Sequence, residues 1–196
     1  MILKFYSIDA SLETLRRELI IDETGTYAPQ LGSYLIKKGF DVEIITMHHA
    51  LFTNKLNLSG KEEFIEHFNK LRDEAKSEKN KKTLSHFIEF IDNGGKITSR
   101  IPCRGDIQEE IDGKRPLCAL MTTNFIYSGK PVFNFHFNVV TGIDDIYVYV
   151  NDPLWDDRGG KNKYTLTEFL YGLYARAYGD LDNASLIKIK QVSKRR

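Results

Sequence analysis

The chain has 196 residues, 41% of them hydrophobic and 28% charged, and its formal net charge at pH 7 is +1. This length suffices for a single domain with a buried core, and the small net charge gives no electrostatic reason to expect a nucleic-acid partner. Two cysteines cannot form a disulfide framework, and no window is apolar for long enough to span a membrane, so a cytoplasmic location is the default expectation.

The first third of the chain predicts helices followed by a strand. Residues 1–6 are apolar apart from one lysine and indicate a helix. A second short helix is expected from residue 9, because Leu12, Leu15 and Leu19 fall on one helical face. A third begins near Thr26 and ends before Gly39, and the alternating pattern of residues 40–44 then predicts a strand.

The middle of the chain differs in kind. Ser59 and Glu62 have the spacing of a capping box, which predicts a charged amphipathic helix, and a second helix ends at residues 94–95. We interpret residues of about 59–95 as a helical hairpin that packs on the main body of a single domain. A short helix over 106–111, a buried strand over 117–121, a helix from Thr165 and a final strand from Ile187 complete the prediction.

Residues 132–153 predict a β-hairpin that carries the candidate chemistry. Turn-forming residues 142–145 separate two segments in which apolar and polar side chains alternate. Matching the apolar faces pairs Val139 with Val148 and sets His136 opposite Asn151, with Asp152 next along the strand. Pro153 then ends regular pairing, so Asp152 is expected to turn toward the histidine.

An imidazole held by a carboxylate or an amide has a fixed tautomer and orientation, as a general base requires. His136 with Asp152, or alternatively with Asn151, is therefore a candidate catalytic pair. The same pattern also fits a half-exposed histidine on the polar face of an ordinary hairpin. No cofactor or metal is expected, since His48 and His49 are adjacent and would point to opposite faces of a strand.

The string from His136 to Asp145, followed by the strand that ends in Asp152 and Pro153, resembles the histidine hairpin of cysteine peptidase family thirty-nine, whose relatives include double-glycine leader peptidases. The resemblance implies an α+β, papain-like cysteine proteinase fold, in which N-terminal helices pack on an antiparallel sheet. It also implies that His136 is the base, that Asp152 orients it, and that a peptide or protein is the substrate.

The resemblance also implies that the nucleophilic cysteine lies before Met1, because residues 1–9 resemble the second half of the helix that carries it. Cys118 lies in an apolar run and is expected to be a buried structural thiol. Cys103, beside Arg104, is a secondary candidate, although nothing in the sequence places it near His136.

Three functions remain open. The first is an active peptidase whose nucleophile lies upstream of Met1, so that residues 1–196 alone would not hydrolyse a substrate. The second is a non-catalytic relative that binds a peptide or a partner, and the third is transglutaminase-like acyl transfer, which uses the same order of Cys, His and Asp.

Overall fold

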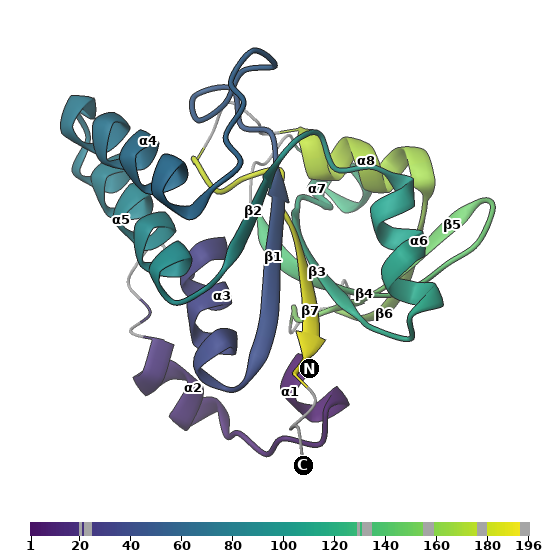
Figure 1. Ribbon diagram of the computed structural model, residues 1–196. Helices are drawn as coiled ribbons and strands as arrows, with labels where there is room; N and C mark the ends of the chain where they lie inside the picture. The colour runs from purple at the N-terminus through teal and green to yellow at the C-terminus, as the bar shows by residue number, and fades with distance from the viewer. Residues whose placement is uncertain are drawn as a thin grey trace.

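The computed structural model describes residues 1–19, 21, 25–128, 130, 135–154, 159–175 and 180–192, in which helices surround one seven-stranded sheet (Figure 1). The helices are α1 (Ile2–Phe5), α2 (Leu12–Leu19), α3 (Ala28–Lys37), α4 (Lys61–Glu74), α5 (Glu78–Asp92), α6 (Arg104–Asp112), α7 (Asn124–Tyr127) and α8 (Leu166–Tyr174). The strands are β1 (Phe40–Thr46), β2 (Lys96–Ser99), β3 (Leu117–Met121), β4 (His136–Ile143), β5 (Tyr147–Asp152), β6 (Gly160–Thr165) and β7 (Leu186–Gln191).

The sheet has the strand order β2-β1-β7-β3-β4-β5-β6. Strands β1 and β2 are parallel and the other neighbours are antiparallel, so the predicted antiparallel sheet is wrong at this one pair. The parallel pair is possible because α4 and α5 lie between β1 and β2 in the chain and supply the long crossover that parallel strands require.

Each face of the sheet carries its own hydrophobic cluster. Side chains from α1, α3, α4 and α5 cover one face, and side chains from α6 and α8 cover the other. Alternation along a strand divides its residues between the two clusters, as for Val139 in the first and Val140 in the second. Figure 1 shows α3, α4 and α5 on the left and α6, α7 and α8 on the right.

Most predicted elements are present, with small differences at their ends. Helices α4 and α5 pack against each other where the hairpin was expected, but Gly60 is the N-cap of α4, and Ser59 donates its backbone N–H to Glu63. The predicted hairpin strand begins at His136, and residues 131–134 lie outside the described residues. In the described part of the chain, no helix is long and apolar enough to cross a bilayer.

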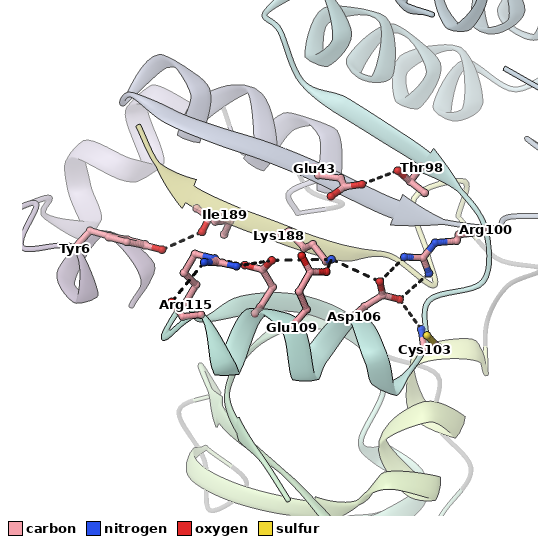
Figure 2. Close-up of polar contacts among 12 residues, drawn as sticks. Tyr6, Glu43, Thr98, Arg100, Cys103, Asp106, Glu109, Arg115, Lys188 and Ile189 are labelled. Atoms are coloured by element: carbon pink, nitrogen blue, oxygen red, sulfur yellow. Dashed lines mark hydrogen bonds and ion pairs between the residues drawn. The ribbon is translucent and has the colours of Figure 1, made fainter. Parts of the chain in front are cut away.

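Helix α6 is attached to the sheet by a network of ion pairs (Figure 2). Lys188 on β7 is only 5% exposed, and its Nζ lies 2.6 Å from Glu109 Oε2 and 3.6 Å from Asp106 Oδ1. Asp106 also pairs with Arg100 and accepts a hydrogen bond of 2.8 Å from the backbone N–H of Cys103. These contacts bury charges only where each has an opposite charge beside it.

Candidate active site at the ends of strands β4 and β5

Two side chains meet where β4 begins and β5 ends. His136 is the first residue of β4, and Asp152 is the last residue of β5. The imidazole Nε2 lies 2.8 Å from Asp152 Oδ2, which is hydrogen-bonding distance. The Asp152 side chain is fully buried, whereas the His136 side chain is 19% exposed. The buried carboxylate therefore fixes the Nε2 edge of the imidazole, while part of the ring remains accessible to solvent.

The register that joins the two strands differs from the predicted one. Val139 pairs with Asn151 and not with Val148, and a bulge between Val140 and Gly142 shifts the register near the turn. Strand β4 continues to Ile143, and the pair nearest the turn is Ile143 with Val148, whereas the prediction ended the pairing at Thr141 and Ile146. The misplaced turn shifts every partner, and the bulge changes the register by one further residue. The predicted pairing is wrong for this reason.

The observed register also explains why Asp152 faces His136. Across β3 and β4, His136 pairs with Met121, which belongs to the same hydrophobic cluster as Val150. Residues two apart on a strand share a face, so Asp152 leaves β5 on the side of Val150 and His136. Asn151 leaves on the opposite side, and the prediction that set it opposite His136 is wrong.

The second carboxylate oxygen of Asp152 is also occupied. Oδ1 accepts a hydrogen bond of 2.9 Å from the backbone N–H of Leu154, across Pro153. A carboxylate that bonds the backbone two residues on forms an Asx-turn, which here turns the chain away as β5 ends. Both oxygens thus have partners, and the carboxylate has a single orientation.

The Nδ1 atom of the His136 ring is available to react. Among the described residues, the only hydrogen bond of the imidazole ring is the one between Nε2 and Asp152. The carboxylate accepts a hydrogen bond from the Nε2–H, and this assigns the neutral tautomer in which Nδ1 carries a lone pair. That nitrogen can accept a proton from a thiol or a water placed beside the exposed edge of the ring.

One neighbour of this pair has an environment that the sequence did not reveal. Asn138 alternates with the apolar residues of β4 and so shares the polar side of the strand pattern with His136, but it is fully buried, because α6 and α8 cover this face of the sheet. On β6, burial raises the pKa of the Tyr164 phenol, with smaller contributions from Tyr127 and the charge of Asp152. Asn138 and Tyr164, which lie on the same side of the sheet as Asp152, are therefore largely shielded from bulk water.

Neither cysteine joins His136. Cys103 is the exposed N-cap of α6, and no hydrogen bond between it and His136 occurs among the described residues. Cys118 is buried, and this burial raises the pKa of its thiol to about 12. Its side chain lies in the hydrophobic cluster with Val139, on the face of the sheet opposite to His136.

A largely apolar cavity of about 470 Å³ lies on the other face of the sheet, and neither His136 nor Asp152 lines it. Phe137 and Pro153, the chain neighbours of His136 and Asp152, line it together with Met1. Leu12, Leu15 and Leu19 of α2 also face this cavity, and none of the residues of α2 is buried. The remaining lining residues are Ile2, Leu3, Lys4, Ile8, Asp9, Ala10, Leu31, Tyr34, Leu35, Cys118 and Val139.

No group of three or more histidine, cysteine, aspartate or glutamate side chains is arranged to hold a metal ion in the part of the chain that the structure describes.

Comparison with known protein families matches residues 1–181 to the Peptidase_C39 like family. A sequence search of curated proteins finds no match.

Proposed function

The chain belongs to the Peptidase_C39 like family, and on that premise we propose that it is a cysteine-peptidase-like domain in which His136 is the general base and Asp152 orients it. The hydrogen bond of 2.8 Å between these side chains is the observation that carries the proposal. It fixes the tautomer that leaves Nδ1 able to accept a proton, and it compensates the positive charge that the ring acquires when it does so.

The nucleophile of this proposal is a thiol that residues 1–196 do not supply. Cys118 lies on the wrong face with a raised pKa, and Cys103 caps a helix without contacting the imidazole. We therefore assign the thiol to a polypeptide segment outside residues 1–196, packed in the apolar cavity. This cavity lies on the face opposite to His136, but Phe137 and Pro153, the chain neighbours of the pair, line it, so a segment seated there can reach the strand ends at which the exposed edge of the imidazole lies.

The open apolar stripe of α2 supports the same assignment. An amphipathic helix gains most of its stability by burying its apolar face, yet α2 turns Leu12, Leu15 and Leu19 toward the cavity and leaves Leu12 exposed and the other two only partly buried. A segment in the cavity would cover this stripe. By this argument residues 1–196 alone have the base and its acid but no hydrolytic activity.

The reaction then follows from the two roles. His136 takes the proton of the thiol, and the thiolate sulfur attacks the carbonyl carbon of a peptide bond to form a tetrahedral oxyanion. The imidazolium returns its proton to the leaving amine as the carbon–nitrogen bond breaks and an acyl-enzyme remains. Water, deprotonated by His136, then releases the acid and regenerates the thiol. The substrate class is a peptide or a protein segment.

We propose that the chain has a papain-like fold into which the helices of residues 59–95 are inserted. We assign the mixed helix and sheet arrangement to the papain-like fold within one domain. We assign helices α4 and α5 to an insertion, because they lie between β1 and β2 in the chain and α5 packs against β2, which is far from β4 and β5 in the strand order.

The test compares residues 1–196 with a chain extended by the residues encoded in frame before Met1. The extended chain is expected to hydrolyse peptides and to react with iodoacetamide at its upstream cysteine. His136→Ala should abolish both, while Asp152→Ala should lower the rate by up to about 10⁴-fold, because the imidazole then has no acceptor to orient it. Cys103→Ser is the matched control and should leave both unchanged.

Alkylation of the unextended chain provides the contrary outcome. We expect Cys103 to react at the same rate in the native chain and in His136→Ala, and Cys118 to react only after unfolding, because it is buried. Labelling of Cys103 that depends on His136 would show that the nucleophile has been misplaced.

A non-catalytic domain that binds a peptide in the cavity is the second candidate, favoured by the position of both cysteines away from His136. It predicts peptide binding without hydrolysis in the extended chain. Transfer of the acyl group to an added amine in preference to water would instead indicate transglutaminase-like chemistry.

A further inference from the structure

We propose that Asn138 is a positioning residue for the His136–Asp152 pair, acting on the Asp152 carboxylate through a bridging water. The inference rests on the proposed function, since it concerns how the base is held. Asn138 is fully buried, and neither its side-chain nitrogen nor its side-chain oxygen has a hydrogen-bond partner among the described residues.

The register places Asn138 beside Asp152. Val139 pairs with Asn151 and Val140 with Val150, so the next pair outward along the two strands joins Asn138 to Asp152. Cross-strand neighbours on one face have Cβ atoms about 5 Å apart. His136 lies two residues before Asn138 on β4 and leaves the sheet on the same side.

We assign one bridging water to the space between the two side chains. No direct hydrogen bond joins the Asn138 amide to the carboxylate, although the two side chains are neighbours. A buried water needs two to four polar partners, and here the amide N–H, the amide oxygen and a carboxylate oxygen are all at hand. The water would donate to Asp152 and accept from the amide, which holds the carboxylate against the imidazole.

An amide side chain at this position lowers the free energy of unfolding, and packing alone gives no reason for a polar residue here. The face around Asn138 is apolar, with Val140 next along β4 and Ala119 opposite it on β3. A buried polar group without a partner destabilises the folded state, whereas an apolar residue of the same size would not. A role in orienting Asp152 accounts for the amide in this place.

The test uses two replacements that differ by one group. Asn138→Thr keeps a hydroxyl that can hold the water, and Asn138→Val has a methyl group of the same shape in its place, while both residues favour strands. The ¹⁵N shifts of the His136 ring report its tautomer, and solvent exchange of its Nε2–H reports the strength of the bond to Asp152. Unfolding by urea is measured alongside as the structural readout.

We expect Asn138→Val to remain folded, with Nε2–H exchange about tenfold faster than in the native protein, the change that corresponds to loss of one hydrogen bond. Asn138→Thr should keep the native tautomer and exchange rate. Ser33→Ala is the matched control, because the Ser33 hydroxyl is also buried without a partner but lies on α3. It should leave the His136 signals unchanged.

Asp152→Ala, which removes the acceptor of the Nε2–H, separates the inference from the proposed function. If that variant leaves the His136 tautomer unchanged, the pair itself is not formed, and the proposed function fails. If it changes the tautomer while Asn138→Val behaves as the native protein does, only the role of Asn138 is overturned. Should Asn138→Val fail to fold, equal exchange rates in Asn138→Thr and Asn138→Ala would overturn the role in the same way.

Discussion

Asp152 has no oxygen that is available to solvent. One oxygen accepts from His136 and the other from the backbone N–H of Leu154, so the side chain links the histidine to the turn that follows β5. A carboxylate in this position affects both the imidazole orientation and the local stability. The two effects can be measured separately, because the first requires spectroscopy of the ring and the second only an unfolding curve.

We expect Asp152→Ala to lower the free energy of unfolding by about 1–3 kcal/mol, because it leaves the imidazole Nε2 and the Leu154 N–H without their acceptor. Asp145→Ala is the matched control. Its side chain is 98% exposed in the turn between β4 and β5, and its loss should change the free energy by no more than about 0.5 kcal/mol. Equal urea midpoints for the two variants would contradict the buried position of Asp152.

The charge network of α6 shows how an element is held to the sheet by more than apolar contacts. Burial raises the pKa of Asp106, but the hydrogen bonds from Arg100 and from the Cys103 backbone outweigh it and lower that pKa to about 2. Since the usual value is 3.8, Asp106 stabilises the folded state fully above that pH and loses its contribution as the pH falls toward 2.

Asp106→Asn should therefore lower the free energy of unfolding by about 2 kcal/mol at pH 7, as the shift in pKa implies. The difference from the native protein should shrink between pH 4 and about 2, because the native carboxyl is then protonated as well. Urea unfolding at several pH values gives the comparison. Asp112→Asn, at the exposed end of the same helix, should show no such pH dependence, and a constant difference for Asp106→Asn would refute the argument.

Helices α6 and α8 also differ in how closely their glycines approach the sheet. A Cβ on Gly172 of α8 would lie 2.5 Å from the backbone oxygen of Thr122, whereas a Cβ on Gly105 of α6 would meet only Cys103 Sγ, at 3.7 Å. The first contact lies at the end of β3, close to the strand pair that holds His136.

We expect Gly172→Ala to destabilise the protein by about 1–3 kcal/mol, the usual effect of overpacking, since the helix must move away from β3. Gly105→Ala should be neutral or stabilising by up to about 1 kcal/mol, because alanine favours a helix more than glycine does. Thermal unfolding of both variants is the measurement. A stabilised Gly172→Ala would mean that α8 is not seated against Thr122.

The sequence predicted these elements unevenly, for physical reasons. Capping boxes and helical periodicity are local, so the start of α8 at Thr165 and the apolar strand β3 were predicted correctly. Strand β6 is largely polar and lies at the edge of the sheet, so it has no apolar alternation to reveal it. The bulge in β4 and the burial of Asn138 depend on partners from distant parts of the chain, and no local pattern encodes them.

The whole molecule is organised around β7. It pairs with β1 on one side and β3 on the other, and it contributes Ile187 and Ile189 to one hydrophobic cluster and Leu186 to the other. The two halves of the sheet and the clusters on its two faces thus share one strand. Such an arrangement favours a single cooperative unfolding transition.

Hydrogen exchange tests this cooperativity. The amides of Ile44 on β1 and Val148 on β5, both fully buried, should exchange with the same free energy, equal to that of global unfolding. Leu186→Ala should lower both values together by about 2–5 kcal/mol, because it opens a cavity where the halves meet. Unequal losses at the two amides would show that the halves unfold separately.

The central place of β7 has a consequence for biosynthesis. Every other strand leaves the ribosome before β7 does, yet β1 and β3 have no contact with each other in the sheet except through it. Until β7 emerges, the nascent chain must keep two incomplete sheets with unpaired edges, which are the features that chaperones protect from aggregation. A stop codon shortly before Leu186 would therefore release a polypeptide that contains both His136 and Asp152 but has no means of uniting its two halves.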